Sequence, residues 1–317
     1  MPVSAQPAGG HGRMRDSGQT MPSGVPAMPS GAPETPRGET GRGQSWSIAL
    51  ALLAPVLWST SGLFVKILPI APVPLAALRA LIAGVTLAPF WRPRGLTLSW
   101  PLAVMLASYT LSVLCYVSAV RLTTAANAIA LVSTAPAWVA ALTWIAERRV
   151  RWLLVPPVAL VLAGVAIVLA EPAAGRSVEG NLLGLGGGLA FGLFIFFLPR
   201  VRQPVVGRVV LCNLFAAAAL FLASPGAILA VRPGLWDWVA LAYLGAIQIG
   251  LATVCFAAAL TRISAAQASV LTLLEPLLSP LWVYLAIGEK PSAYGFAGGA
   301  FILGGILVDL LVRRWRG

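Results

Sequence analysis

Long apolar stretches recur along the chain from residue 47 almost to the C-terminus, separated by short polar segments. At about 1.5 Å of rise per residue, each stretch is long enough as an α-helix to cross a hydrocarbon layer roughly 30 Å thick. The stretches are continuous, whereas strands of a membrane barrel would alternate with period two over about ten residues. The pattern predicts an all-α integral membrane protein with ten transmembrane helices, over residues 47–66, 72–91, 99–119, 123–145, 152–170, 181–198, 209–231, 235–259, 264–286 and 293–312.

The composition agrees with a membrane protein. Hydrophobic residues make up 58% of the 317 residues and charged residues only 10%, with a mean hydropathy of +0.86. Residues 1–46 differ, because they hold seven Pro and nine Gly and too few bulky apolar side chains to bury a core. We expect these residues to form a disordered cytoplasmic tail, and residues 313–317 to form a short basic cytoplasmic tail.

The net charge of +12 is spread over the ends of the apolar stretches, which argues against a nucleic-acid partner. With the N-terminus in the cytoplasm, sixteen of the 22 basic residues fall in inside segments and five in outside segments. The positive-inside bias therefore predicts that both termini are cytoplasmic. The expected surroundings are a lipid bilayer, and the expected location is the cell membrane (plasma or inner), crossed many times.

An internal repeat relates the two halves of the chain. A shift of 140 residues aligns RLTTAANAIALVSTAP (121–136) with TRISAAQASVLTLLEP (261–276), including three alanines, a leucine and the final proline. Two five-helix units are therefore expected, over residues 47–170 and 181–312. Because five is odd, the second unit enters the membrane from the opposite side, which predicts the inverted repeats of many secondary transporters.

Two charged residues lie well inside predicted helices. Glu275 is near the centre of the ninth, where an ionised carboxylate is costly, so it should face a partner, water or a cavity. Burial favours its protonated form, which makes it a candidate proton carrier, although a protonated Glu275 that only bonds neighbouring helices is an equal alternative. Arg79 lies in the second helix, and we expect pairing with Glu275 or snorkelling to the surface ahead of direct contact with an anionic substrate group.

Prolines and polar or aromatic side chains add to this picture. Pro136, Pro276 and Pro280 lack a backbone donor, so we expect helix breaks there, either to expose backbone to substrate or as packing kinks. A mainly apolar and aromatic site with a few polar groups is typical of small-molecule binding, although each such residue alone is more simply an interhelical bond. The candidates for substrate or proton binding are Glu275, Arg79, Trp58, Tyr116, Asn127, Trp138, Gln248 and Gln267.

Several of these features together resemble a known family. LWSTSGLFVK in the first helix, LAALRALIAG in the second, and LLEPLLSPLWVYLAIGEK before a glycine-rich last helix are similar to the EamA-type transporters of the drug/metabolite transporter superfamily, over residues 47–312. The resemblance implies a two-repeat transporter with a central cavity. It also implies a small organic substrate, amino-acid- or drug-like, that the protein exports. One departure is Ala135, which stands where the second copy has Glu275.

Other functions find less support in the sequence. The chain lacks the phosphate-loop pattern, so transport should be secondary or facilitative. A membrane-embedded enzyme such as a lipid-group transferase is the alternative, but the one histidine, His11, lies in the N-terminal tail and no metal-ligand spacing occurs. We therefore expect no enzyme activity, no metal and no cofactor. A non-transporting scaffold or channel stays open, as does the oligomeric state, with a homodimer as one alternative.

Overall fold

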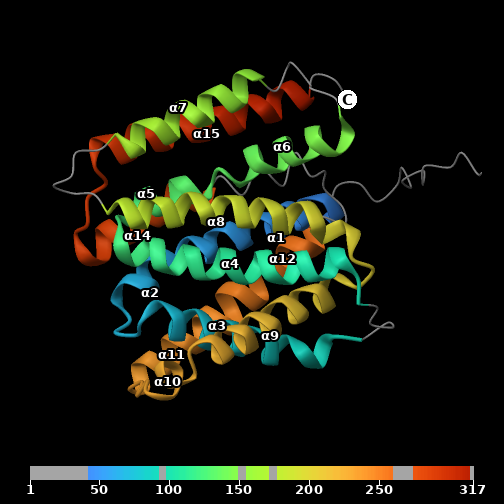
Figure 1. Ribbon diagram of the computed structural model, residues 1–317, viewed down its shortest axis with the longest axis vertical. Coiled ribbons are helices and arrows are strands. Elements are labelled where there is room, and N and C mark those ends of the chain that lie inside the picture. The colour runs from blue at the N-terminus through green and yellow to red at the C-terminus, as the bar shows by residue number, and fades with distance from the viewer. Residues whose placement is uncertain (1–41, 93–97, 149–154, 171–176, 260–273, 315–317) are drawn as a thin grey trace, which may run out of the picture. The chain divides into compact units, whose positions relative to one another are not determined.

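The computed structural model describes residues 42–92, 98–148, 155–170, 177–259 and 274–314 (Figure 1). Within these ranges the chain is helical and contains no strand. Its first half holds α1 (Arg42–Ser59), α2 (Ser61–Ile67), α3 (Pro72–Leu87), η1 (Ala88–Phe90), α4 (Trp100–Leu122), α5 (Ala125–Val132), α6 (Ala135–Glu147) and α7 (Val155–Leu169). Its second half holds α8 (Val178–Phe197), η4 (Leu198–Arg200), α9 (Val205–Ala223), α10 (Pro225–Leu229), α11 (Leu235–Ala242), η5 (Tyr243–Leu251), α12 (Ala252–Ala259), α14 (Leu274–Ile287) and α15 (Ala293–Arg314).

Ten apolar helical segments correspond to the ten predicted helices. Six segments among the described residues are long and apolar enough to cross a membrane, namely Pro72–Phe90, Trp100–Leu122, Ala125–Ala146, Val178–Phe197, Val205–Ala223 and Leu235–Phe256. Four shorter apolar helices occupy the other positions, at Leu52–Ile67, Val155–Leu169, Leu274–Ile287 and Ala293–Gly305. The protein is therefore a multi-pass membrane protein, while ten crossings and two cytoplasmic termini stay predictions.

The N-terminal boundary differs from the sequence prediction. Helix α1 begins at Arg42, earlier than the first predicted span, so the last residues of the predicted tail are helical. The remainder of that tail, residues 1–41, lies outside the described residues, as does the first part of the ninth predicted helix.

Several of the predicted helices are interrupted, and two of the breaks hold hydroxyl side chains that bond to the preceding turn. Thr60 separates α1 from α2, and its hydroxyl donates to the carbonyl of Leu57 at 2.7 Å. Ser133 and Thr134 separate α5 from α6 and donate to carbonyls of the preceding turn at 2.8 and 2.7 Å. Such bonds compete with the helical ladder and satisfy carbonyls that a break would leave bare. The eighth helix is interrupted differently, by the π-helix η5.

Helix contacts recur in the way that the internal repeat requires. Helix α4 of the first half packs along α8 of the second. The pair that the repeat makes equivalent, α12 of the second half with α1 of the first, is also in contact. Helices α5 and α6 pack on α8, and correspondingly α14 packs on α1 and α2. The self-equivalent pairs α3 with α9 and α7 with α15 are in contact too, and Figure 1 shows α7 and α15 side by side. Contacts exchanged in this way are those of a pseudo-two-fold axis between the repeats.

The largest buried cluster joins α2, α3 and α4 to α11 and η5. Its fully buried side chains include Val65, Leu75, Val117, Leu241 and Leu244. In lipid, exchanging tails for protein brings little hydrophobic gain, so close packing and dispersion hold these helices together. This cluster fixes the part of α3 that carries the buried Arg79.

Small residues let α7 and α15 approach at the backbone. A Cβ atom added at Gly298 would lie 2.5 Å from Cγ2 of Val168 and 2.6 Å from the carbonyl oxygen of Gly164. Neither distance is tolerated between real atoms, and one of the two neighbours is rigid backbone. The contact between α7 and α15 therefore depends on glycine at residue 298.

We expect Gly298→Ala to lower the thermal unfolding temperature of the purified protein in detergent. Overpacking costs about 1–3 kcal/mol, which outweighs the gain in helix propensity of about 0.8–1 kcal/mol. The matched control is Gly304→Ala on the same helix, because a Cβ there meets nothing within 4 Å. Intrinsic tryptophan fluorescence on heating measures both variants, and an equal shift in the two would contradict the close approach.

Candidate functional site

Residues 59–61, at the break between α1 and α2, bind three other helices through three successive hydroxyls. The Ser59 hydroxyl oxygen accepts a hydrogen bond from the Trp282 indole nitrogen of α14 at 2.9 Å. The Thr60 hydroxyl and the Tyr243 hydroxyl of η5 share a hydrogen bond, also at 2.9 Å. The hydroxyls at the break thus form hydrogen bonds that connect the two repeats.

The third hydroxyl, that of Ser61, contacts the buried Arg79. Nη1 of Arg79 donates to Ser61 Oγ at 3.2 Å, and the guanidinium carbon lies 5.7 Å from the centre of the Tyr116 ring. Arg79 is only 5% exposed, and its Nε has no hydrogen-bond partner. These contacts hold the guanidinium between α2 and α4 with neutral groups alone.

The two interactions expected for Arg79 are absent from the described part of the chain. No Asp or Glu there lies within ion-pair distance of the guanidinium, so the expected pairing with Glu275 does not form. The side chain does not snorkel either, because it is buried among helices. The guanidinium instead packs on Tyr116, an arrangement that spacing along the chain does not reveal.

Glu275 lies in the first turn of α14 and is partly buried. Its carboxyl group lies near Tyr116. The Tyr116 hydroxyl has no hydrogen-bond partner, although it lies near Ser61. Tyr116 therefore lies near both predicted charged residues, Arg79 of the first repeat and Glu275 of the second.

Trp58 and Gln248 lie together between α1 and η5. The Gln248 amide nitrogen lies 3.4 Å from the carbonyl oxygen of Trp58, and the Trp58 ring packs on Phe256 with centroids 5.2 Å apart. Gln248 is 4% exposed, and its amide oxygen has no hydrogen-bond partner among the described residues. A buried amide satisfied on one side only is a candidate contact for a polar solute group.

Asn127 and Trp138 lie in helix packing contacts, and no described contact joins them to Arg79. Asn127 is fully buried in α5, where its amide oxygen occupies the space beside Gly295 of α15. Trp138 lies in α6 against Gly192 of α8, where an added Cβ would lie 2.7 Å from the Trp138 Cβ. Gln267 lies outside the described residues.

The three prolines occupy different positions in their helices. Pro136 is in the first turn of α6, directly after the break at Ser133 and Thr134. Pro276 is in the first turn of α14, and residues 260–273 before that helix lie outside the described residues. Pro280 is inside α14, which continues on both sides, so this residue does not end the helix.

Sequence reasoning missed several residues of this site. Ser61, Tyr243 and Trp282 all bond to the break or to Arg79, but none was a candidate. Ser279 is buried without a hydrogen-bond partner and lies against Gly62. The triplet Ser-Thr-Ser beside a glycine was the available signal, since hydroxyls in sequence before a glycine mark a helix interruption.

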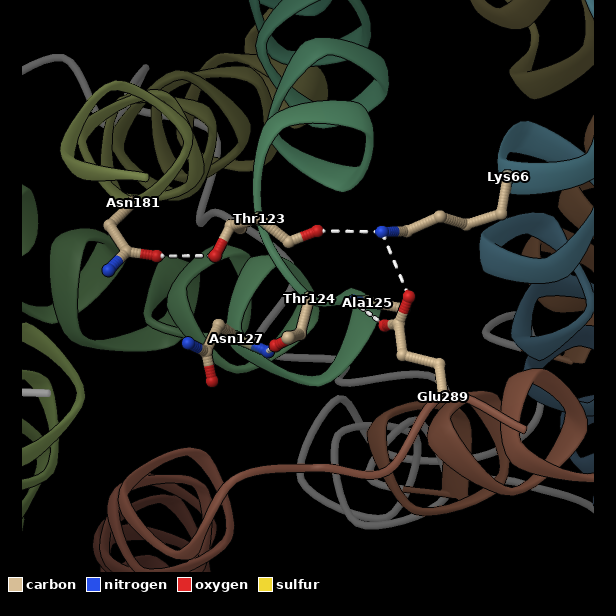
Figure 2. Close-up of polar contacts among 7 residues, drawn as sticks. All are labelled: Lys66, Thr123, Thr124, Ala125, Asn127, Asn181 and Glu289. Atoms are coloured by element: carbon tan, nitrogen blue, oxygen red, sulfur yellow. Dashed lines mark hydrogen bonds and ion pairs between the residues drawn. The ribbon is translucent and has the colours of Figure 1, made fainter. Parts of the chain in front are cut away.

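A second polar network lies at the far end of α2 (Figure 2). The Lys66 ammonium forms an ion pair with a carboxylate oxygen of Glu289 at 3.0 Å and donates to the carbonyl oxygen of Thr123 at 2.8 Å. The other carboxylate oxygen of Glu289 accepts from the backbone N–H of Ala125, the first residue of α5, at 2.7 Å. We name Lys66, Thr123, Ala125 and Glu289 the inter-repeat latch, because it joins the first repeat to the segment between α14 and α15.

Neighbouring side chains extend the latch to α8. The Thr123 hydroxyl donates to the amide oxygen of Asn181 at 3.0 Å, and Thr124 caps α5 by accepting from the N–H of Asn127 at 3.2 Å (Figure 2). The Glu289 carboxylate beside the N-terminus of α5 also suits the helix dipole. Segments from both repeats are thus tied together at one end of the helices.

We expect Lys66→Met and Glu289→Gln each to lower the thermal stability of the detergent-solubilised protein, with a coupling of about 1 kcal/mol in a double-mutant cycle. The Lys66 and Glu289 side chains are 16% and 22% exposed, so the burial of this ion pair is intermediate between that of a surface salt bridge and that of a fully buried one. Lys290→Met is the matched control, because this exposed lysine next to Glu289 is not part of the latch. A coupling near zero would show that the pair does not hold the repeats together.

Hydroxyl-lined helix breaks, a buried cation and repeat-related helix contacts within an apolar helical fold are features of the multi-pass membrane transporters. The chain belongs to the EamA-like transporter family, whose sequence profile matches residues 45–170 and again residues 178–310. The family domain is thus duplicated along the chain. The protein is accordingly a membrane transporter of the drug/metabolite transporter type.

Individual relatives agree with this assignment. The chain is 29% identical to the uncharacterized transporter YwfM of Bacillus subtilis over 294 residues, covering 84% of this chain and 94% of that protein. It is 28% identical to an uncharacterized transporter of Archaeoglobus fulgidus over 199 residues, covering 62% of this chain and 72% of that protein. A solved crystal structure superposes with a TM-score of 0.61 at 24% identity, covering 86% of this chain and 99% of the other, which shows the fold alone.

Proposed function

We propose that this protein is a secondary or facilitative transporter that exports small organic solutes, amino-acid- or drug-like, across the cell membrane. It works by alternating access between two inverted five-helix repeats, with both termini in the cytoplasm. The observation that carries the proposal is the polar cluster at residues 59–61, where breaks in the helices of one repeat bond to α14 and η5 of the other. Polar groups at interrupted helices are where transporters of this kind bind their solutes.

The repeat-related contacts are consistent with alternation between two states. If the repeats are inverted, exchanging their conformations closes one end of the helices and opens the other. The inter-repeat latch supports a closed end in the state described here, because Lys66, Ala125 and Glu289 join both repeats there. In the alternate state the latch must separate. Solute shifts the equilibrium only through different affinities for the two states.

Flux into proteoliposomes tests transport and alternation together. We expect the protein to exchange at least one labelled solute of an amino-acid and drug panel faster than empty liposomes do. Lys66→Cys with Glu289→Cys, in a background where Cys115, Cys212 and Cys255 are Ser, should lose this flux on cross-linking with a reducible bifunctional thiol reagent. Reduction should restore it, because an end that cannot open cannot exchange solute. Each single-cysteine variant with the same reagent is the control.

Two results would contradict the proposal in different ways. If no solute moves faster than in empty liposomes, the protein does not transport this class. If the cross-linked protein exchanges solute at the full rate, transport occurs without opening of the latch.

Glu275 is the proposed proton carrier, because it is an acidic residue in the first turn of α14, inside a predicted transmembrane helix, and lies near Tyr116. We expect Glu275→Gln to lose uptake driven by a pH gradient while keeping exchange of labelled for unlabelled solute, since exchange needs no net proton movement. Glu179→Gln, on the exposed first turn of α8, is the matched control. If Glu275→Gln keeps full gradient-driven flux, the transporter is a uniporter or couples elsewhere.

A further inference from the structure

Arg79 carries a charge that the protein itself does not neutralise. We infer that its guanidinium binds a carboxylate group of the transported solute, with the Tyr116 hydroxyl as a second donor. This inference rests on the proposed function and adds a substrate class to it, namely organic monocarboxylates. The evidence is the geometry of the Ser61, Arg79 and Tyr116 cluster.

The guanidinium is poorly satisfied where it lies. A buried cation needs an opposite charge or a full set of hydrogen bonds, because leaving water is costly. Arg79 is 5% exposed and has five N–H donors. The one hydrogen bond described for them goes to the neutral Ser61 Oγ at 3.2 Å, and Nε has no partner. A ring centre 5.7 Å away is near the outer limit of a cation–π contact and does not replace an anion.

A second unused donor lies next to the first. The Tyr116 hydroxyl, from α4, has no hydrogen-bond partner, although a buried tyrosine hydroxyl normally finds one. It lies near Ser61, the residue to which Arg79 donates, so the unused donors of two helices converge on one place. A carboxylate has two oxygens and can accept from a guanidinium and a phenol together, whereas a neutral carbonyl offers a single weaker acceptor.

The charge balance favours one negative charge on the solute. Arg79 interacts electrostatically with Tyr116 and Tyr109, and no second basic residue is among its partners in the described chain. Two other basic residues of the same repeat are engaged elsewhere: Lys66 in the latch and Arg121 with the carbonyls of Leu68 and Ile70. One guanidinium offsets one carboxylate, while a doubly charged phosphate would leave a buried negative charge without an opposite charge.

The position of Ser61 fits release as well as binding. When no solute is bound, the Ser61 hydroxyl accepts a hydrogen bond from one N–H of Arg79, so the guanidinium keeps one hydrogen bond in the empty site. Because this bond is neutral, a charged acceptor displaces it readily; charge-assisted bonds are about twice as strong. Ser61 is the first residue of α2, directly after the break, and belongs to the segment that carries the latch at its other end.

Paired probes test the inference on the full-length protein in detergent. Aliphatic, aromatic and α-amino monocarboxylates are each compared with the matching primary amide, at constant ionic strength set with sodium chloride, by thermal unfolding. We expect at least one carboxylate to raise the unfolding temperature in a saturable way while its amide does not. Arg79→Gln should weaken that carboxylate about ten- to a hundredfold, as loss of a charged hydrogen bond predicts.

Two further variants make the result specific. Tyr116→Phe keeps the ring but removes the hydroxyl, and should weaken the same carboxylate about tenfold. Arg208→Gln removes a half-buried guanidinium that donates to the carbonyl of Leu198, and should leave carboxylate binding unchanged. If Arg79→Gln does not fold, Tyr116→Phe and the preference of the wild type for carboxylate over amide decide the question.

The inference is overturned if no carboxylate stabilises the wild type more than its amide. It is also overturned if Arg79→Gln, eluting as a single folded species, binds the carboxylate as tightly as the wild type. Failure of the proposed function looks different, because carboxylates would then bind in detergent while no solute crosses proteoliposomes. Conversely, flux of carboxylates and amides at equal rates would support transport and reject the role of Arg79.

Discussion

A backbone N–H or carbonyl left without a partner in hydrocarbon costs several kcal/mol, and this cost governs where the chain can interrupt its helices. The breaks at Thr60 and at Ser133–Thr134 lie against other helices. Thr60 meets η5, and Thr134 is buried against α8. In these two breaks, hydroxyls bond to carbonyls of the turn before, so the interruption is stable without water. The polar residues that a transporter needs are therefore confined to places where the packing already supplies partners.

The same constraint explains what the sequence could and could not predict. Lipid demands long apolar helices, so hydropathy alone predicted apolar helices where the described residues form them, six of which are long enough to cross a membrane. The repeat was also visible, because equivalent prolines and alanines survive at a constant offset. The break at Thr60 was not predicted, although the Ser-Thr-Ser triplet at 59–61 was a signal for it. The partner of the Thr60 hydroxyl, Tyr243, lies far along the chain and could not be identified from the sequence.

For the candidate site, too, the sequence predicted one part and not the other. Arg79, Glu275 and Tyr116 were identifiable as unusual residues in apolar surroundings, and the structure places Tyr116 near each of the other two. Their partners were not identifiable, because the contacts depend on how helices of different repeats pack. Arg79 packs on Tyr116 and not on an acid, while the acid that does form an ion pair, Glu289, binds Lys66 across more than half the chain. Charge type can be read from a sequence, but which charges meet depends on the helix packing.

The repeats are similar in fold but unequal in polar residues. GLFVKILP (62–69) in the first repeat aligns with GLFIFFLP (192–199) in the second, so Lys66 corresponds to Phe196. Phe196 packs under the guanidinium of Arg200 at 3.7 Å, which gives that end an aromatic contact in place of the Lys66 ion pair. In the same way Ala135 corresponds to Glu275. The equivalent positions of the two repeats therefore carry interactions of different sensitivity to salt.

Helix α2 has only seven residues, and so is about 10 Å long. Its first residue, Ser61, bonds to Arg79, and Lys66 near its other end bonds to Glu289. A helix of two turns is too short to bend, and Thr60 frees it from α1 at one end. The same short helix therefore carries a contact of the buried cation at one end and the ion pair between the repeats at the other. A rigid-body movement of α2 would change both contacts at once.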